Sequence, residues 1–164
     1  MTSTPMVRRD LADIADLFRE RYLGMVRLAG LLGADDPEDI AQEAFARLMR
    51  KGLPDADPVP YLRMIVCNLT RNRHRHLRIV RRRTPAVVDE PSTEHAAILR
   101  EEHAEVIAVL ATLPVRRREA IVLRYWLDLS EREIAQTMGI SPGTVKSHVS
   151  RGLAALAQAL EARA

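Results

Sequence analysis

Apolar residues recur at three- and four-residue steps through most of the chain, which is the spacing of α-helices that each bury one face. From Leu11 to Ala29 this spacing marks a first helix, which Gly33 and the acidic pair Asp35-Asp36 end. A second helix opens at Asp36-Pro37. Because no alternation of strand type stands out, the pattern predicts an all-α protein.

Prolines divide the rest of the chain. A loop rich in proline follows the second helix, and a third helix then begins near Leu62 and runs into a block of arginines. Pro85 and Pro91 bracket a polar stretch without helical spacing. We therefore expect two small helical domains, residues 1–83 and 93–164, joined by a flexible linker over residues 84–92. In the second domain we expect a helix to about Leu113 and another through Leu127.

The segment from Leu129 to Leu153 has the local signals of two short helices joined by a turn. Ser130 followed by Glu133 forms a capping box at the first helix start. Gly139 tolerates the left-handed conformation that ends a helix, and Ser141-Pro142 provides an N-cap and first-turn proline for the next. The segment is therefore predicted to be a helix-turn-helix.

The second of these helices has two different faces. An apolar side is predicted to pack inward through Val145, Val149, Leu153 and Leu156. The polar side carries short hydroxyl and basic side chains, which suit a DNA major groove, and its candidate contacts are Thr144, Lys146, Ser147, His148 and Arg151. The competing interpretation is an ordinary helical hairpin with a solvated face.

Charge is strongly segregated along the chain. The net charge is only +3, but residues 63 to 83 hold eight arginines and no acid, whereas acidic side chains dominate residues 87 to 105. The third helix therefore has a basic face opposite its apolar one, an expected track for a phosphate backbone. Tyr61 at its start could stack on an unpaired base. The expected contacts are Tyr61, Asn68, Arg71, Asn72 and Arg75, with Arg78 and Arg82 continuing the stripe.

The second helix is expected to present a mixed acidic and apolar face, typical of a protein partner rather than DNA. Ile40, Ala44 and Leu48 point inward. Its outward and flanking residues are Asp39, Gln42, Glu43, Phe45, Ala46 and Met49. Solvation of an acidic helix start explains part of the same pattern.

Nothing in the sequence predicts catalysis, a metal or a cofactor. The lone Cys67 sits among apolar residues and suits a buried helix position. His74 and His76 point to different sides of a helix, which disfavours a shared metal ion. Since no apolar run reaches about 20 residues and no hydrophobic signal region opens the chain, we expect a cytoplasmic protein.

Taken together, the chain resembles the extracytoplasmic-function sigma factors, the small two-domain initiation subunits of bacterial RNA polymerase. The resemblance rests on DPEDIAQEAFARLMR (residues 36–50), YLRMIVCNLTRNRHRHLRIVRRR (residues 61–83) and the segment from Leu113 through the helix-turn-helix. It implies a sigma region 2 domain over residues 1–83 and a region 4 domain over residues 93–164. Promoter DNA, core polymerase and an anti-sigma factor are the partners considered.

The resemblance also assigns roles to the candidate residues. Asp39, Gln42, Glu43 and Phe45 would bind the clamp helices of the largest polymerase subunit. Asn68, Arg71, Asn72 and Arg75 would meet the minus-ten element, and the polar face that begins at Thr144 would meet the minus-thirty-five element. The chain departs from the family pattern at Tyr61, where tryptophan is usual, and at Asn72, where aspartate is frequent.

Two other classes of protein share part of the pattern. A free-standing helix-turn-helix regulator would explain residues 141–153 but not the acidic helix followed by an arginine track. A recombinase or nuclease would need a catalytic constellation, and none is visible in the sequence.

Overall fold

The computed structural model describes the backbone of residues 5–83 and 94–164, and the side chains of residues 10–80, 101 and 103–164. Within these ranges the chain is helical and contains no strand. The helices are α1 (Pro5–Leu31), α2 (Pro37–Lys51), α3 (Val59–Arg83), α4 (Glu94–Leu110), α5 (Val115–Ile121), the π-helical turn η1 (Val122–Trp126), α6 (Glu131–Met138) and α7 (Pro142–Glu161). The predicted all-α class is confirmed.

The helix ends form where the local signals place them. The Asp36 carboxylate accepts a hydrogen bond from Asp39 N at 3.2 Å and caps α2. The Ser130 and Glu133 capping box closes at both ends, and Gly139 ends α6 with a φ of 67°. Ser141 Oγ accepts from Thr144 N at 3.2 Å at the start of α7. The helix-turn-helix is therefore specified locally by its caps.

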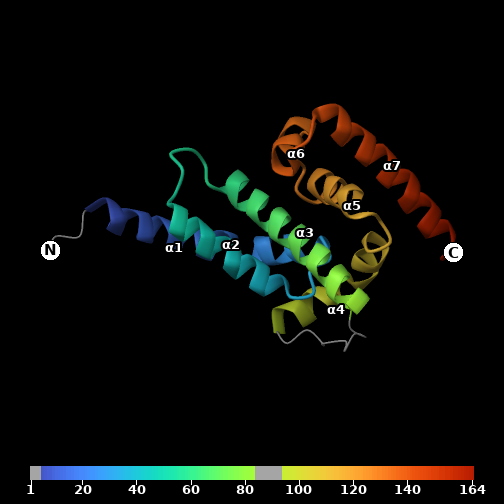
Figure 1. Cartoon of the computed structure of the whole chain (residues 1–164), viewed down its shortest axis with the longest axis horizontal. Coiled ribbons are helices and arrows are strands. Elements are labelled where there is room, and N and C mark those ends of the chain that lie inside the picture. The colour runs from blue at the N-terminus through green and yellow to red at the C-terminus, as the bar shows by residue number, and fades with distance from the viewer. Residues whose placement is uncertain (1–4, 84–93) are drawn as a thin grey trace.

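Helix α3 lies between the two halves of the fold (Figure 1). It packs on α1 and α2 along one side and on α6 along another, while α5 packs against α7. Helix α4, which the sequence analysis assigned to the C-terminal domain, packs chiefly on α1 and less on α7. The predicted linker, residues 84–92, lies outside the described residues, so the domain boundaries remain predictions.

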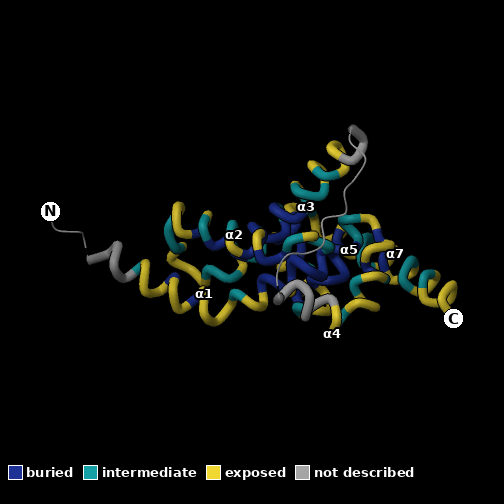
Figure 2. The backbone as a smooth tube through the Cα atoms, turned by 90° about the horizontal axis from the view of Figure 1, so that it is seen from below, coloured by how far each residue is buried: buried dark blue, intermediate teal, exposed yellow. Residues whose placement is uncertain are grey.

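The buried residues form one continuous apolar core rather than two separate ones. Figure 2 shows them concentrated in the middle of the molecule, whereas the last turns of α7 are largely exposed. The core runs from Leu28, Ile40 and Val66 in the N-terminal half to Leu123 and Val145 in the C-terminal half. The two halves are therefore packed together in this structure, which the sequence pattern did not predict.

Two local features differ from the predicted helices. The expected helix through Leu127 changes to π geometry at Val122, where Leu127 N donates to Val122 O at 3.3 Å. In α7, Leu153 is 42% exposed instead of buried. The helix packs through Val145 and Gly152, because a Cβ at Gly152 would lie only 2.8 Å from Ile121 Cγ1. This close approach turns Leu153 away from the core.

Candidate nucleic-acid interface

The polar face of α7 is partly open to solvent. Thr144, Lys146 and Arg151 are exposed, and Ser147 and His148 are half-buried. Thr144 Oγ1 shares a 2.8 Å hydrogen bond with the Ser141 hydroxyl, so the cap also orients a predicted contact residue. No acidic residue occurs in α7 before its last position, Glu161. The face is therefore electrostatically suited to the edges and phosphates of duplex DNA.

His148 lies in a cationic neighbourhood. Partial burial lowers the pKa of its imidazole, and the charges of Arg116, Arg117 and Arg151 lower this pKa further, against a smaller opposing effect of Glu119. His148 is therefore held in its neutral form to a lower pH than an ordinary histidine. As a neutral ring it can donate or accept a hydrogen bond to a base edge.

The basic face of α3 is divided into a free part and an engaged part. Asn72, Arg75 and Arg78 are exposed. Asn68 and Arg71, by contrast, are half-buried against α5. Arg82 lies outside the described side chains. The structure thus keeps the predicted stripe on one helix but covers its N-terminal portion.

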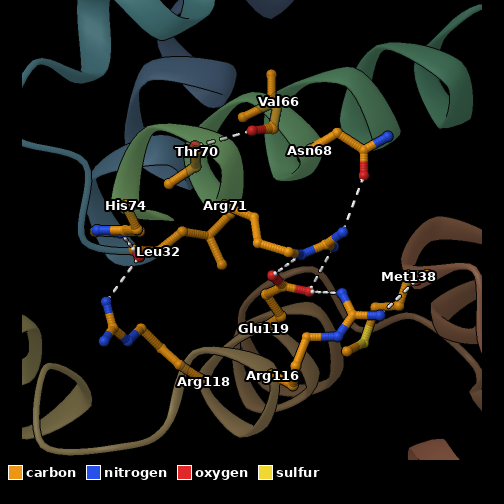
Figure 3. Close-up of polar contacts among 10 residues, drawn as sticks. All are labelled: Leu32, Val66, Asn68, Thr70, Arg71, His74, Arg116, Arg118, Glu119 and Met138. Carbon is orange, nitrogen blue, oxygen red and sulfur yellow. Dashed lines mark hydrogen bonds and ion pairs between the residues drawn. The ribbon is translucent and has the colours of Figure 1, made fainter. Parts of the chain in front are cut away.

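Arg71 makes a two-point ion pair with Glu119 of α5 (Figure 3). Its Nε donates to Glu119 Oε1 at 2.7 Å and its Nη2 donates to Oε2 at 2.9 Å. Arg71 Nη1 also donates to Asn68 Oδ1 at 3.2 Å. The hydrogen bonds to Glu119 raise the pKa of the Arg71 guanidinium. The Glu119 side chain is only 3% exposed, so the pair is shielded from salt.

Glu119 is held in place from its own side of the contact. Arg116 Nη1 donates to Glu119 Oε2 at 2.8 Å, and Arg116 Nη2 donates to Met138 O at 2.8 Å. The Glu119 carboxylate is therefore positioned by contacts within the C-terminal half, through Arg116 of α5 and the end of α6, independently of α3. Sequence reasoning missed Glu119, because its partner Arg71 lies 48 residues away.

A second polar contact joins the two halves near the end of α1. Arg118 Nη1 donates to Leu32 O at 2.8 Å, and His74 Nε2 donates to the same carbonyl at 3.1 Å (Figure 3). Gly33 packs closely against this group, because an added Cβ there would clash with Arg118 Nη1. Burial lowers the pKa of Arg118. His74 is therefore a packing residue at this junction and does not point to open solvent.

Tyr61 lies at the start of α3 and is half-buried. The Lys51 ammonium sits 4.8 Å from its ring centroid, a cation–π arrangement. One side of the ring region faces a small cavity of about 250 Å³ shared with Met64, Glu133 and Gln136. The C-terminal half of the protein therefore also approaches Tyr61, as it approaches Arg71.

The outward face of α2 is acidic and partly engaged in ion pairs. Asp39 Oδ2 accepts from Arg73 Nη1 of α3 at 2.6 Å, and Gln42 Nε2 donates to the Tyr22 hydroxyl at 3.3 Å. Hydrogen bonds from Arg47 and then Arg50 lower the pKa of the Glu43 carboxyl. The Glu43 carboxylate is thus charged and accessible. Met49 is exposed beside it.

Phe45 does not lie on this face. Its side chain is 3% exposed and packs edge-on against Phe18, with a ring-centroid distance of 5.0 Å. Tyr22 stacks on Phe18 in the same group of rings. The expectation that Phe45 is available to a partner is therefore wrong for this structure. The aromatic ring has its best partners inside the fold, where it anchors α2 to α1.

The sequence analysis also missed an apolar groove of about 670 Å³. Tyr125 and Trp126, turned outward by η1, are 60% and 45% exposed, and Leu153 faces them from α7. The groove is lined by Leu31, Val106, Val109, Leu110, Ile121, Val122, Tyr125, Trp126, Leu153, Leu156 and Leu160, with Glu105 and Arg163 also contributing. No signal for this groove was evident in the sequence, because Leu153 was predicted to pack inward.

The described part of the chain does not favour metal binding or thiol chemistry. No group of three or more histidine, cysteine, aspartate or glutamate side chains is placed there to hold a metal ion. Cys67 is buried, and burial, followed by the charge of Glu119, raises the pKa of its thiol to about 12. Among the described helices, none combines the length and apolar character needed to cross a membrane.

A capped helix-turn-helix with a cationic outer face, carried on an all-α chain beside a second basic helix, defines a helix-turn-helix DNA-binding protein. The family model for sigma-70 region 4 matches residues 103–156. This match contains all of α5, η1 and α6 and most of α7.

Similarity to known sigma factors extends over nearly the whole chain. The RNA polymerase sigma-E factor of Streptomyces avermitilis is 32% identical over 171 residues, covering 96% of this chain and 90% of that protein. The ECF RNA polymerase sigma factor SigW of Bacillus subtilis is 29% identical, covering 91% and 88%. The chain therefore belongs to the extracytoplasmic-function sigma factors and is a transcription initiation factor.

The fold agrees with this assignment. CnrH, solved in complex with the cytosolic domain of CnrY, superposes with a TM-score of 0.73 at 22% identity, covering 97% of this chain and 94% of that one. The sigma factor RpoE of Bartonella quintana, solved with the anti-sigma factor NepR, gives a TM-score of 0.62 at 21% identity, covering 89% and 97%.

Proposed function

We propose that the chain directs core RNA polymerase to promoters through three surfaces on three helices. Helix α2 binds the polymerase, α3 captures the minus-ten strand, and α7 reads the minus-thirty-five element as duplex. The protein acts in the cytoplasm, by binding and without a cofactor of its own. The observation that carries this division is that the acidic, basic and helix-turn-helix surfaces are chemically distinct and lie on separate elements.

The proposed duplex contacts are Thr144, Lys146, Ser147, His148 and Arg151. Lys146 and Arg151 are exposed cations able to meet phosphates or guanine edges, and the two hydroxyls can bond to either. The capped N-terminus of α7 adds the positive end of the helix dipole. An α-helix with these properties fits the major groove of B-form DNA.

The proposed strand contacts are Tyr61, Asn68, Arg71, Asn72 and Arg75. Asparagine amides can bond to the edges of bases that have left the stack, and arginines can follow the phosphates. Asn72 and Arg75 are already exposed. Tyr61 offers a flat ring, although Lys51 lies over that ring in this structure.

The proposed polymerase contacts are Asp39, Gln42 and Glu43, with Met49 as an apolar neighbour. The Glu43 carboxylate is already ordered by Arg47 and Arg50 of the same helix, which reduces the entropy lost on binding. Phe45 supports this face from within by packing on Phe18. Its place in the proposal is structural.

We assign the apolar groove to an anti-sigma factor. The groove is lined mainly by apolar side chains of α4, η1 and α7, and such a lining suits one face of an amphipathic helix. The similar RpoE structure was solved with the anti-sigma factor NepR, which supports such a partner class. Glu105 and Arg163 supply polar groups near the apolar lining.

Transcription of a promoter library by core polymerase, with and without the protein, tests the proposed function. Promoter-specific transcripts should require the protein, and they should be reduced by Arg151→Ala and by Glu43→Lys. A free-standing regulator would instead bind a promoter duplex tightly and specifically without polymerase. Library transcription that is the same with and without the protein would refute the proposal.

A further inference from the structure

We propose that Glu119 is an autoinhibitory latch: it occupies Arg71 and holds the helix-turn-helix half against α3, so that strand capture requires the two halves to separate. The inference deepens the proposed function and rests on it. It assigns to Glu119 and Arg118 a regulatory role in the free protein, distinct from any contact with DNA or polymerase.

The Arg71 guanidinium is fully committed in the closed arrangement. Its three nitrogens all donate, two to the Glu119 carboxylate and one to Asn68. The same fork of donors is what a phosphate group would require. A strand phosphate and Glu119 therefore compete for one site, and Asn68 is held by the same interaction.

The C-terminal half covers more of α3 than the Arg71 region alone. Helix α6 packs on α3, and its Glu133 and Gln136 face Tyr61 and Met64 across the small cavity. Residues proposed to meet the melted strand are therefore screened at both Tyr61 and Arg71. The C-terminal half also reaches α1 through Arg118 and Leu32 O.

The closed arrangement also conflicts with the spacing of the two promoter elements. Elements centred about 25 base pairs apart are separated by about 85 Å along straight duplex at 3.4 Å per base pair. Here α5 lies between α3 and α7. Its Glu119 pairs with Arg71 of α3, and its other side packs on α7. Packed helices are about 8–10 Å apart, so two such spacings amount to only about 20 Å. The halves must separate to engage both elements.

The contact has the character of a reversible latch. The cost of removing both charges from water offsets much of their attraction. Such a pair therefore adds little net stability to the closed arrangement, although it specifies which residues meet. On opening, Arg71 and Glu119 regain water, and Glu119 keeps Arg116 as a partner. A bound strand would then replace Glu119 at Arg71. By linkage, strand binding and closure disfavour each other to the same degree.

The full-length protein, labelled with a fluorescent donor and acceptor at Asp55→Cys and Arg132→Cys, tests the latch by energy transfer. Both positions are exposed, and they lie in opposite halves. The native Cys67 is buried in the closed form, and Cys67→Ala in all samples leaves only the two introduced thiols. Affinity for a short, mixed-sequence single-stranded DNA is measured on the same samples without polymerase.

Two variants, each expected to separate the two halves by a different route, are compared with matched controls. Glu119→Gln removes the latch charge, and Asp128→Asn removes one charge from an exposed residue of the same half whose positive φ asparagine tolerates. Gly33→Ala displaces Arg118, whereas Gly52→Ala also places alanine at a positive φ but with nothing within 4 Å of the added Cβ. Circular dichroism verifies that each variant remains helical.

Glu119→Gln and Gly33→Ala should each lower energy transfer relative to their controls. If the open form is about one tenth of the wild type, complete opening should raise single-strand affinity about tenfold. Saturating single strand should also lower transfer in the wild type. Folded variants with wild-type transfer and affinity within about twofold of wild type would overturn the latch. If both variants fail to fold, wild-type transfer unchanged at saturating strand overturns it.

A transcription assay separates failure of the latch from failure of the proposed function. If energy transfer does not respond but promoter-specific transcription by core polymerase still requires the protein, only the latch is wrong. If no promoter-specific transcription requires the protein, the proposed function is wrong as well.

Discussion

Arg73 Nη1 lies 2.6 Å from Asp39 Oδ2, which ties the acidic face of α2 to the basic face of α3. The two residues are 34 positions apart in the sequence. The pair joins the proposed polymerase surface to the proposed strand surface. A polymerase contact at Asp39 can therefore release or restrain the Arg73 side chain, which lies beside the proposed strand-binding residues of α3.

A double-mutant cycle with Asp39→Ala and Arg73→Ala should give a small coupling energy. Both side chains are more than one third exposed, so solvent and salt weaken the pair, and about 0.2–1 kcal/mol is expected. Urea unfolding of the four proteins measures it. The coupling should shrink at high salt. Coupling that is undiminished by salt would contradict this view of the pair.

Glu43→Lys should weaken binding to core polymerase by more than tenfold, that is, by more than about 1.4 kcal/mol. It reverses a charge on the proposed surface and places three cations together where Arg47 and Arg50 now share one carboxylate. Fluorescence anisotropy with purified core enzyme provides the measurement. Glu161→Lys, at the exposed end of α7, is the control for net charge. Equal affinities of the two variants would remove Glu43 from the interface.

Gly152→Ala should destabilise the protein by about 1–3 kcal/mol through overpacking. The added Cβ would lie 2.8 Å from Ile121 Cγ1, at the contact of α7 with α5. Gly143→Ala in the same helix meets nothing within 4 Å and is the matched control. Thermal unfolding of both variants should show a loss only at position 152. A stable Gly152→Ala protein would mean that α7 does not pack this closely.

Arg151→Ala should lose about 1–3 kcal/mol of discrimination at one upstream promoter position. A template with a pre-melted bubble should not restore its activity, because the contact is to duplex. Asn72→Ala should slow melting of the promoter DNA. The pre-melted bubble should restore the activity of this variant at least in part. Asn72 is preferred here to Asn68 or Arg71, which also take part in the contact with Glu119. Abortive transcription from matched duplex and bubble templates provides the measurement. If the bubble rescued Arg151→Ala and not Asn72→Ala, the roles proposed for α7 and α3 would be reversed.

Duplex binding should strengthen as the pH falls below about 6.5, the ordinary histidine pKa. In the free protein, burial and the charges of Arg116, Arg117 and Arg151 lower the pKa of His148. A nearby phosphate favours the charged imidazole, so the bound form takes up a proton over the interval between the two pKa values. His148→Gln should abolish this dependence. Anisotropy titrations across this pH range, at constant ionic strength, provide the measurement.

Local signals in the sequence were sufficient for the helices and their ends. Capping at Ser130 and Ser141, the turn at Gly139 and the helical spacing depend on neighbours within a few residues, so they can be read without knowledge of the fold. The polar face of α7 follows in the same way, because its residues share one helix. The residue types of the three proposed surfaces were evident for the same reason.

The tertiary structure decided which of these side chains are free. Phe45 is withdrawn into contact with Phe18, Leu153 is turned outward because Gly152 packs on Ile121, and Arg71 is engaged by Glu119. Each outcome depends on a partner that is distant in the sequence. Helical periodicity specifies which face a residue occupies, but packing between helices determines whether that face meets solvent, core or a charge of opposite sign.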